Sequence, residues 1–142
     1  MQYSILNAKN SLPSTEELVE LYDAVGWSAY TRTPERLAPM LAGSRYLYVA
    51  RENTAEGAER LIGLVRAVGD GQTIAYIQDL LVHPQAQHHG IGSALLGKNL
   101  ADFDRESIRH RYCGHTRHRA HRRFGFTPVQ DNGCVTLAKY VF

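Results

Sequence analysis

A loop rich in glutamine, histidine and glycine carries the residues whose types and spacing are best suited to chemistry. Its members in chain order are Gln87, His88, His89, Gly90, Ile91 and Gly92, followed directly by Ser93. Residues 73–82 before the loop have the composition of a strand, and residues 92–104 after it have apolar side chains at helical spacing. The first four N–H groups of a helix lack partners inside it and, together with the helix dipole, attract phosphate. Because glycine has no Cβ, a phosphate can approach this backbone closely.

The spacing within the loop excludes two other phosphate-binding motifs. The third glycine of a dinucleotide fingerprint is absent, and so is the Gly-Lys-Ser/Thr sequence of a P-loop. The longer string V-x-P-x-x-Q-x-x-G-x-G-x-A-L-L, residues 82–96, resembles motif A of the GNAT superfamily of N-acetyltransferases, whose signature is Q/R-x-x-G-x-G/A. Residues 124–128, Phe-Gly-Phe-Thr-Pro, resemble a later element of that family.

This resemblance implies that acetyl-CoA is the cosubstrate. The backbone amides of residues 88–93 would bind the coenzyme pyrophosphate, directly after the signature residue Gln87. The backbone of Leu80, Leu81 and Val82, on a bulged fourth strand, would lie beside the pantetheine arm. Family members splay strands four and five apart, and the arm takes the place of a neighbouring strand. A purely structural glycine turn is the alternative interpretation of the loop.

The reaction that the resemblance implies is direct attack of an amine on the thioester. An amine with a pKa near ~10 is protonated at neutral pH, so a base must remove a proton. Asp79 and Tyr76 on the fourth strand are the candidates, and a buried Asp79 that holds the sheet together is the alternative. Strand alternation puts Tyr76, Gln78, Leu80 and Val82 on one face, and Asp79 on the other, until a bulge changes the phase. A backbone N–H of this strand would stabilise the oxyanion.

The proton donor for the departing thiolate is where the sequence departs from the family pattern. Many members have a tyrosine shortly before the Gly-Phe pair, but this chain has His121 there. Histidine can donate a proton near neutrality, so His121 is the candidate acid. A solvated surface histidine is the alternative interpretation, and Tyr112 is another possible replacement. His83, ahead of Pro84, is expected to end the strand rather than to act in catalysis.

Substrate contacts are expected from the first helices and the loop between them. Trp27 and Tyr30 are the candidates for the wall of an acceptor pocket, with ordinary packing of the helices on the sheet as the alternative.

Residues 105–123 form a strongly basic stretch, with seven arginines and four histidines against the single acid Glu106. The preferred interpretation is a solvated basic edge beside the coenzyme phosphates. The alternatives are a patch that faces nucleic acid and a local reading-frame change in the coding DNA, with the frame restored near Phe124. The histidines at 115, 118 and 121 spread over ~120° of a helix, which is too wide for a metal site, so no metal is expected.

Length and composition predict a single domain over residues 1–142. A hydrophobic content of 44% and a charged content of 21% are those of an ordinary globular protein, and a net charge of +2 is too small to imply nucleic-acid binding. No apolar run approaches the ~20 residues of a membrane span, and the N-terminus does not resemble a signal peptide. Cys113 and Cys134 form neither a metal motif nor a disulfide framework. These features predict a cytoplasmic protein with reduced thiols.

The expected elements follow from periodicity and from start and stop signals. A capping box at Ser14 and Glu17 begins a helix that Gly26 ends, and Thr33-Pro34 begins a second one. Strands are expected at residues 3–6, 45–51, 60–68 and 73–82, a helix at 92–104, a strand and a helix within 105–123, and closing strands at 126–129 and 135–141. This order predicts an α/β (α+β-like) GNAT fold, with a mostly antiparallel sheet of six to seven strands and about four helices.

The sequence therefore predicts an N-acetyltransferase that moves an acetyl group from acetyl-CoA to a primary amine of a small molecule. The short chain and the aromatic first loop favour a small acceptor over a protein tail, and the resemblance allows a homodimer. One alternative is a non-catalytic module that binds acyl-CoA. The other is an acetyltransferase that acts on protein or RNA-linked amines.

Overall fold

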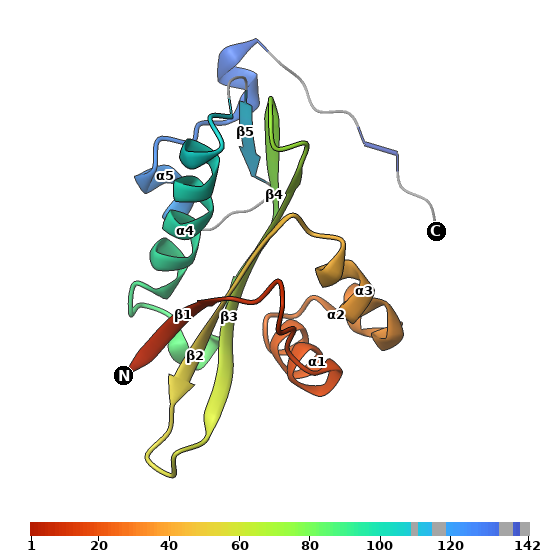
Figure 1. The fold of residues 1–142 in the computed structure, drawn as a ribbon, viewed down its shortest axis with the longest axis vertical. Coiled ribbons are helices and arrows are strands. Elements are labelled where there is room, and N and C mark those ends of the chain that lie inside the picture. Colours follow the sequence, from red (N-terminus) through yellow and green to blue (C-terminus); the bar gives the residue numbers. More distant parts are fainter. Residues whose placement is uncertain (109–110, 115–118, 134–137, 140–142) are drawn as a thin grey trace.

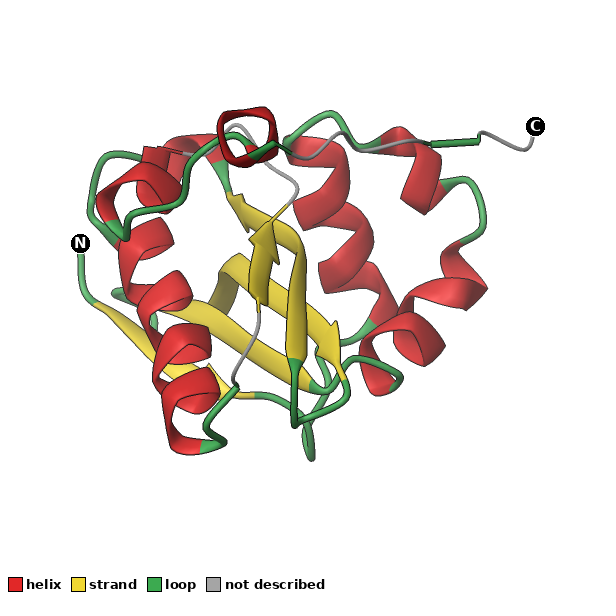
Figure 2. Cartoon of the chain, turned by 90° about the horizontal axis from the view of Figure 1, so that it is seen from above, coloured by secondary structure: helices red, strands yellow, loops and turns green. Residues whose placement is uncertain are grey.

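The computed structural model describes residues 1–108, 111–114, 119–133 and 138–139. Within these ranges a sheet of five strands has helices on both of its faces (Figure 1, Figure 2). The strands lie in chain order: β1 (Tyr3–Asn7), β2 (Tyr46–Asn53), β3 (Glu59–Gly69), β4 (Ile74–Val82) and β5 (Arg111–Gly114). Neighbouring strands from β1 to β4 are antiparallel, and β5 runs parallel to β4.

Two groups of helices cover the sheet. On one face lie α1 (Thr15–Ala24), α2 (Ser28–Thr31) and α3 (Leu37–Ala42), with a 3-10 turn at Pro34–Arg36 before α3 (Figure 1). On the other face lies α4 (Ile91–Arg105), and α5 (Arg119–Arg123) packs against it (Figure 1). A 3-10 turn at Pro84–Ala86 joins β4 to α4.

The expected helix after Ser14 is confirmed, together with its capping box. The Glu17 amide donates to Ser14 Oγ over 3.2 Å, and the Ser14 amide donates to the Glu17 carboxylate over 2.9 Å. Such caps are worth about 0.5–2 kcal/mol. The helix buries Leu18, Leu21 and Tyr22, which lie on its apolar face, against the sheet.

Strand β4 contributes to both hydrophobic cores. Ile77, Leu80 and Val82 belong to the core beneath α4, together with residues such as Leu95 and Phe103 of that helix. Leu81 belongs to the core beneath α1 and α3, which also contains Leu18, Leu47 and Leu64. Both faces of β4 are therefore covered, and the strand lies between the two cores.

The expected number of strands is wrong for the described part of the chain, which forms five strands and five α-helices. Residues 126–129 do not form a closing strand. Pro128 lacks an N–H for a ladder, and a 3-10 turn at Val129–Asn132 follows. The other expected closing strand, residues 135–141, lies almost entirely outside the described residues. None of the described helices has both the length and the apolar composition that a membrane span requires.

Candidate functional site

A β-bulge at Gln78 divides β4 into two halves. Arg66 of β3 pairs with Asp79, but the next residue, Ala67, pairs with Ile77, so Gln78 has no partner in this ladder. The bulge changes the phase of the strand. Gln78 and Asp79 therefore both face α1–α3, where each contacts Tyr30. The expected bulge is confirmed.

The phase change corrects the faces that simple alternation assigned. Leu80 and Val82 face α4 and belong to its core, rather than sharing the face of Gln78. Alternation before the bulge puts Tyr76 opposite Ile77, and therefore on the α1–α3 face with Gln78 and Asp79. The two candidate bases thus share one face of the sheet.

Strand β5 pairs with only the first half of β4. The parallel register runs from Ile74 with Arg111 to Ile77 with Gly114, whereas β4 continues to Val82. Among the described residues, the edge from Gln78 to Val82 has no neighbouring strand on that side. The side chains of Leu80, Leu81 and Val82 are buried in the two cores, so these residues can offer a ligand only their backbone groups.

The loop after β4 leaves the start of α4 open. Gly90 is the N-cap residue in the left-handed conformation, with φ of 79°, and no side chain caps the helix. A Cβ built on Gly90 would meet no atom within 4 Å. The loop itself is anchored, because Gln87 Nε2 donates to the carbonyl oxygen of Val82 over 3.1 Å and His89 Nδ1 lies 2.8 Å from the carbonyl oxygen of Gln87.

This geometry suits an anion. A long helix with an uncapped, exposed N-terminus presents free backbone N–H groups and the positive end of its dipole. Four of the expected coenzyme residues are exposed there, Gln87, His88, His89 and Gly90. Ser93 is half-buried in the first turn, while Ile91 and Gly92 are buried, so the last two could contribute only their amides. Binding by these residues stays a prediction.

Asp79 is the centre of a buried polar cluster. Its side chain is 1% exposed and forms an ion pair with Arg66 Nε. The hydroxyls of Tyr22 and Tyr30 donate to it over 2.8 and 3.0 Å. Burial and the Asp79 charge raise the pKa of Tyr22, which keeps that hydroxyl protonated as a donor. The three donors come from β3, α1 and α2, so these contacts favour the alternative in which Asp79 holds the sheet and helices together.

The aromatic residues expected to line an acceptor pocket lie beside this cluster. The rings of Trp27 and Tyr30 are stacked, with centroids 6.2 Å apart and an interplanar angle of 29°. Tyr30 also packs on Tyr22, with ring centroids 4.9 Å apart. Both Trp27 and Tyr30 remain half-exposed at the surface of the second core. They are therefore brought next to the bulge of β4, but their contact with a substrate stays a prediction.

His121 lies on the other side of the molecule, in α5. It is 6% exposed, and its ring meets Phe126 edge-on with centroids 5.0 Å apart. The expectation of a solvated surface histidine is wrong. Its role as an acid is a prediction, but α5 packs on α4, and the candidate bases face the opposite side of the sheet. The side chain of Tyr112 lies outside the described residues.

The basic stretch is described only in part. Its residues at 109–110 and 115–118, which include two of the histidines weighed as metal ligands, lie outside the described residues. Arg122 and Arg123 are exposed on α5. Within the described ranges, no three His, Cys, Asp or Glu side chains gather as metal ligands would.

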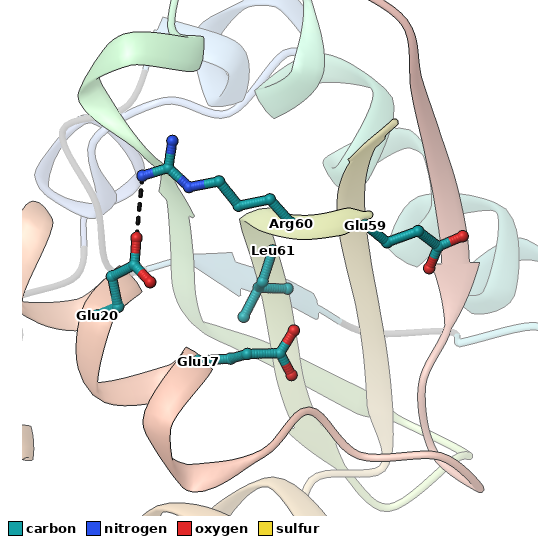
Figure 3. A pocket seen from close by; sticks show the side chains of 5 residues that line it. All are labelled: Glu17, Glu20, Glu59, Arg60 and Leu61. Carbon is teal, nitrogen blue, oxygen red and sulfur yellow. Dashed lines mark hydrogen bonds and ion pairs between the residues drawn. The ribbon is translucent and has the colours of Figure 1, made fainter. Parts of the chain in front are cut away.

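An acidic hollow lies between α1 and β3, away from the start of α4. Glu17, Glu20, Glu59, Arg60 and Leu61 line it (Figure 3). Arg60 donates to Glu20 over 2.9 Å and to Gln85 over 3.3 Å, and it lies 3.1 Å from His83 Nε2. The arginine therefore links α1 to the turn that leads into the loop. His83 directly follows the last residue of β4, as expected, and its side chain caps this turn.

Sequence reasoning missed three parts of the site. Arg66 and Tyr22 were assigned no role, because an ion pair and a hydrogen bond between distant segments leave no local pattern. Gln78 was not singled out, because the position of the bulge depends on pairing with β3. The short helix α2 was expected to be a loop, and its four residues are too few for a periodicity.

Comparisons with known proteins place this geometry in a family. Residues 12–126 match the family model described as "Acetyltransferase (GNAT) family". A solved GNAT family acetyltransferase from Streptococcus pneumoniae has a TM-score of 0.76 and 28% identity, with 99% of this chain and 98% of that chain covered.

Curated relatives resemble the chain over part of its length. A histone acetyltransferase of Glycine max is 38% identical over 58% of this chain and 37% of the relative. A chloroplastic serotonin N-acetyltransferase of Oryza sativa subsp. japonica is 32% identical over 61% of this chain and 42% of the relative. The chain thus spans less than half the length of these two proteins.

Proposed function

The chain belongs to the acetyltransferase (GNAT) family, and from this premise we propose that it transfers an acetyl group from acetyl-CoA to a primary amine of a small molecule. The observation that carries the proposal is the open, uncapped start of α4 at Gly90, directly after the unpaired edge of β4. An anion site and a free strand edge in this order suit a long ligand with a pyrophosphate at one end and an amide-containing arm.

The proposed coenzyme contacts come from the backbone. The amides of residues 88–93 would receive the pyrophosphate, with Gln87 holding the loop to Val82. The backbone of Leu80, Leu81 and Val82 would hydrogen-bond the pantetheine arm, since their side chains are committed to the cores. The thioester would then lie near the bulge.

The proposed reaction is direct attack of the amine nitrogen on the thioester carbon. A C–N bond forms, the C–S bond breaks with its electron pair going to sulfur, and the proton that the nitrogen loses to the base ends on that sulfur, which gives the free thiol of coenzyme A. A backbone N–H of β4 would stabilise the oxyanion. Tyr76, on the α1–α3 face beside Gln78, is the base candidate that the face assignment favours. Asp79 is better suited to orienting Tyr30.

A small acceptor is supported by the stacked rings of Trp27 and Tyr30 beside the bulge. Aromatic faces bind flat groups and attract cationic amines. One similar protein is named for acetylation of serotonin, a small aromatic amine. Another is named a histone acetyltransferase, so protein amines form the rival acceptor class. A cytoplasmic location and a homodimer remain predictions from the sequence.

A thioester-consumption assay tests this proposal. Acetyl-CoA is offered with a panel of primary amines that includes 2-phenylethylamine, an aliphatic diamine, and a lysine-rich peptide. Turnover with the small amines supports the proposal, and turnover with the peptide alone supports the rival. Binding of coenzyme A without turnover on any amine would identify a non-catalytic binding module. Salt-dependent retention on RNA would point to an RNA-linked acceptor.

A further inference from the structure

Gln78 lies at the bulge of β4 with a side chain that faces α1–α3. It is half-buried, and its Nε2 lies 3.4 Å from the hydroxyl oxygen of Tyr30. Among the described residues, this is the one hydrogen bond that its side chain forms. The amide oxygen, Oε1, therefore has no protein donor within the described part of the chain.

The neighbouring groups fix which amide atom faces Tyr30. Asp79 is ion-paired with Arg66 and takes a second hydrogen bond from Tyr22, so it is a carboxylate that only accepts. The Tyr30 hydroxyl must then use its proton toward Asp79, over 3.0 Å. Its oxygen can offer Gln78 only a lone pair, so Gln78 must present Nε2–H to it. The oxygen Oε1 is consequently turned away from Tyr30.

We propose that Gln78 Oε1 accepts a hydrogen bond from the nitrogen of the acceptor amine and orients it for attack, with Trp27 and Tyr30 bounding the carbon skeleton of the amine. The inference rests on the proposed function and names the residue that receives its substrate. Gln78 takes no proton, because an amide is not a base at neutral pH. It acts on the direction of the nitrogen lone pair.

The chemistry of the reaction favours such an acceptor atom. In direct attack the lone pair of the nitrogen points at the thioester carbon, so an N–H bond must point elsewhere. An acceptor that receives this N–H selects the productive orientation, which is a large part of the advantage of a bound reaction. Gln78 supplies it at the bulge, where the unpaired edge of β4 begins. The substrate class is a primary amine attached to a flat group or to a short alkyl chain.

Steady-state kinetics with 2-phenylethylamine test the role of Gln78. Gln78→Leu removes both polar atoms of the amide and leaves a branched apolar side chain that is one methylene shorter. We expect it to lower kcat/KM for the amine about 10-fold to 100-fold, with little change in the KM for acetyl-CoA or in the melting temperature. Gln72→Leu is the matched control, because Gln72 is exposed and distant from the bulge; it should behave as the wild type.

Tyr30→Phe tests the orientation of the amide. Without the hydroxyl, the Gln78 amide loses the group that fixes its direction, so we expect a smaller decrease in kcat/KM for the amine. The double variant combines Gln78→Leu with Tyr30→Phe. Since Tyr30 acts partly through Gln78, its decrease in kcat/KM should be smaller than the product of the two single decreases. If the decrease in the double variant equals the full product, Tyr30 acts only through its ring and its hydroxyl does not orient the Gln78 amide.

Two outcomes would overturn the assignment. Either Gln78→Leu leaves kcat/KM for the amine unchanged, or it raises the KM for acetyl-CoA as much as that for the amine. If the wild type acetylates no amine, the proposed function fails separately. In that case the contact of Gln78 with the amine is tested by calorimetry, which measures the binding of 2-phenylethylamine to the protein saturated with coenzyme A. Weaker binding by Gln78→Leu supports the inference, whereas equal binding, or no binding by the wild type, rejects it.

Discussion

The hydroxyl of Tyr22 on α1 donates a hydrogen bond over 2.8 Å to Oδ2 of Asp79 on β4. The same carboxylate accepts from Tyr30 of α2 and from Arg66 of β3, so one side chain joins four elements. These contacts fasten the short helices to the sheet at the residue that follows the bulge. The aromatic rings and the bulge therefore keep a fixed relation, which an acceptor site beside β4 requires.

Asp79→Asn should lower the free energy of unfolding by about 3–5 kcal/mol, because it leaves the buried guanidinium of Arg66 without its counter-charge. Urea denaturation measures this change. Glu56→Gln is the control, since Glu56 is an exposed carboxylate in the β2–β3 turn and its loss should change stability by less than about 0.5 kcal/mol. If Asp79→Asn abolished turnover at full stability, Asp79 would be the base and not the structural centre.

Gly90 has a left-handed conformation that Gly57 shares. Substitution of both glycines can therefore separate the effect of this conformation on stability from an effect of Gly90 on coenzyme A binding. Gly90→Ala should cost about 1–2 kcal/mol of stability, because L residues disfavour φ of 79°. Gly57→Ala, in the β2–β3 turn, should cost the same, since Gly57 has φ of 78° and equally open surroundings. Only Gly90→Ala should weaken coenzyme A binding, as measured by calorimetry. Equal affinity in the two variants would remove the loop from the coenzyme site.

The sequence was informative where a function or an element depends on neighbouring residues. Ser14 and Glu17 form their capping box, the glycines open α4, and the strands from residues 45 to 82 lie where they were expected. The sequence was less informative where contacts between distant segments determine the structure. The partners of Asp79 come from α1, α2 and β3, and the bulge that turns Gln78 toward them arises from the register with β3.

The α4 helix shows the same limit of sequence reasoning. The apolar spacing of residues 92–104 predicts one inward face, and Leu95 and Phe103 on that face are buried. Asn99 lies between them on the same face and is 0% exposed. A polar residue at a core position looks, in a sequence, like the solvent side of a helix, because the pattern does not record the shape of the opposing sheet.

Asn99→Leu should stabilise the protein. Neither amide atom of Asn99 has a hydrogen-bond partner among the described residues, and burial of an unsatisfied amide costs about 1–3 kcal/mol. Leucine has the same arrangement of side-chain heavy atoms, so it removes this cost without leaving a void. Asn99→Ala is the control and should gain less, because it leaves a cavity. Thermal and urea denaturation measure both. A destabilised leucine variant would contradict this expectation.

The stability of the protein should decrease as the pH falls below about 6.5, and His83 should be one cause. His83 is 9% exposed, and both ring nitrogens face donors: the Gln85 amide lies 3.2 Å from Nδ1, and Arg60 lies 3.1 Å from Nε2. Burial and the positive charge of Arg60 lower the pKa of His83, against a weaker opposing effect of Glu20. Between the lowered pKa and the unfolded value, the unfolded chain binds the extra proton, so acidification favours unfolding.

His83→Asn tests this assignment. Asparagine is a good N-cap residue, so it can still accept from the Gln85 amide, but it does not titrate. Free energies of unfolding, measured in urea at pH 7.5 and at pH 5.5, should therefore fall less in the variant than in the wild type. His88→Asn is the matched control, because His88 is exposed in the coenzyme loop and its side chain forms no hydrogen bond or ion pair with the described residues. An identical decrease in the wild type and in His83→Asn would show that other groups set the acid sensitivity.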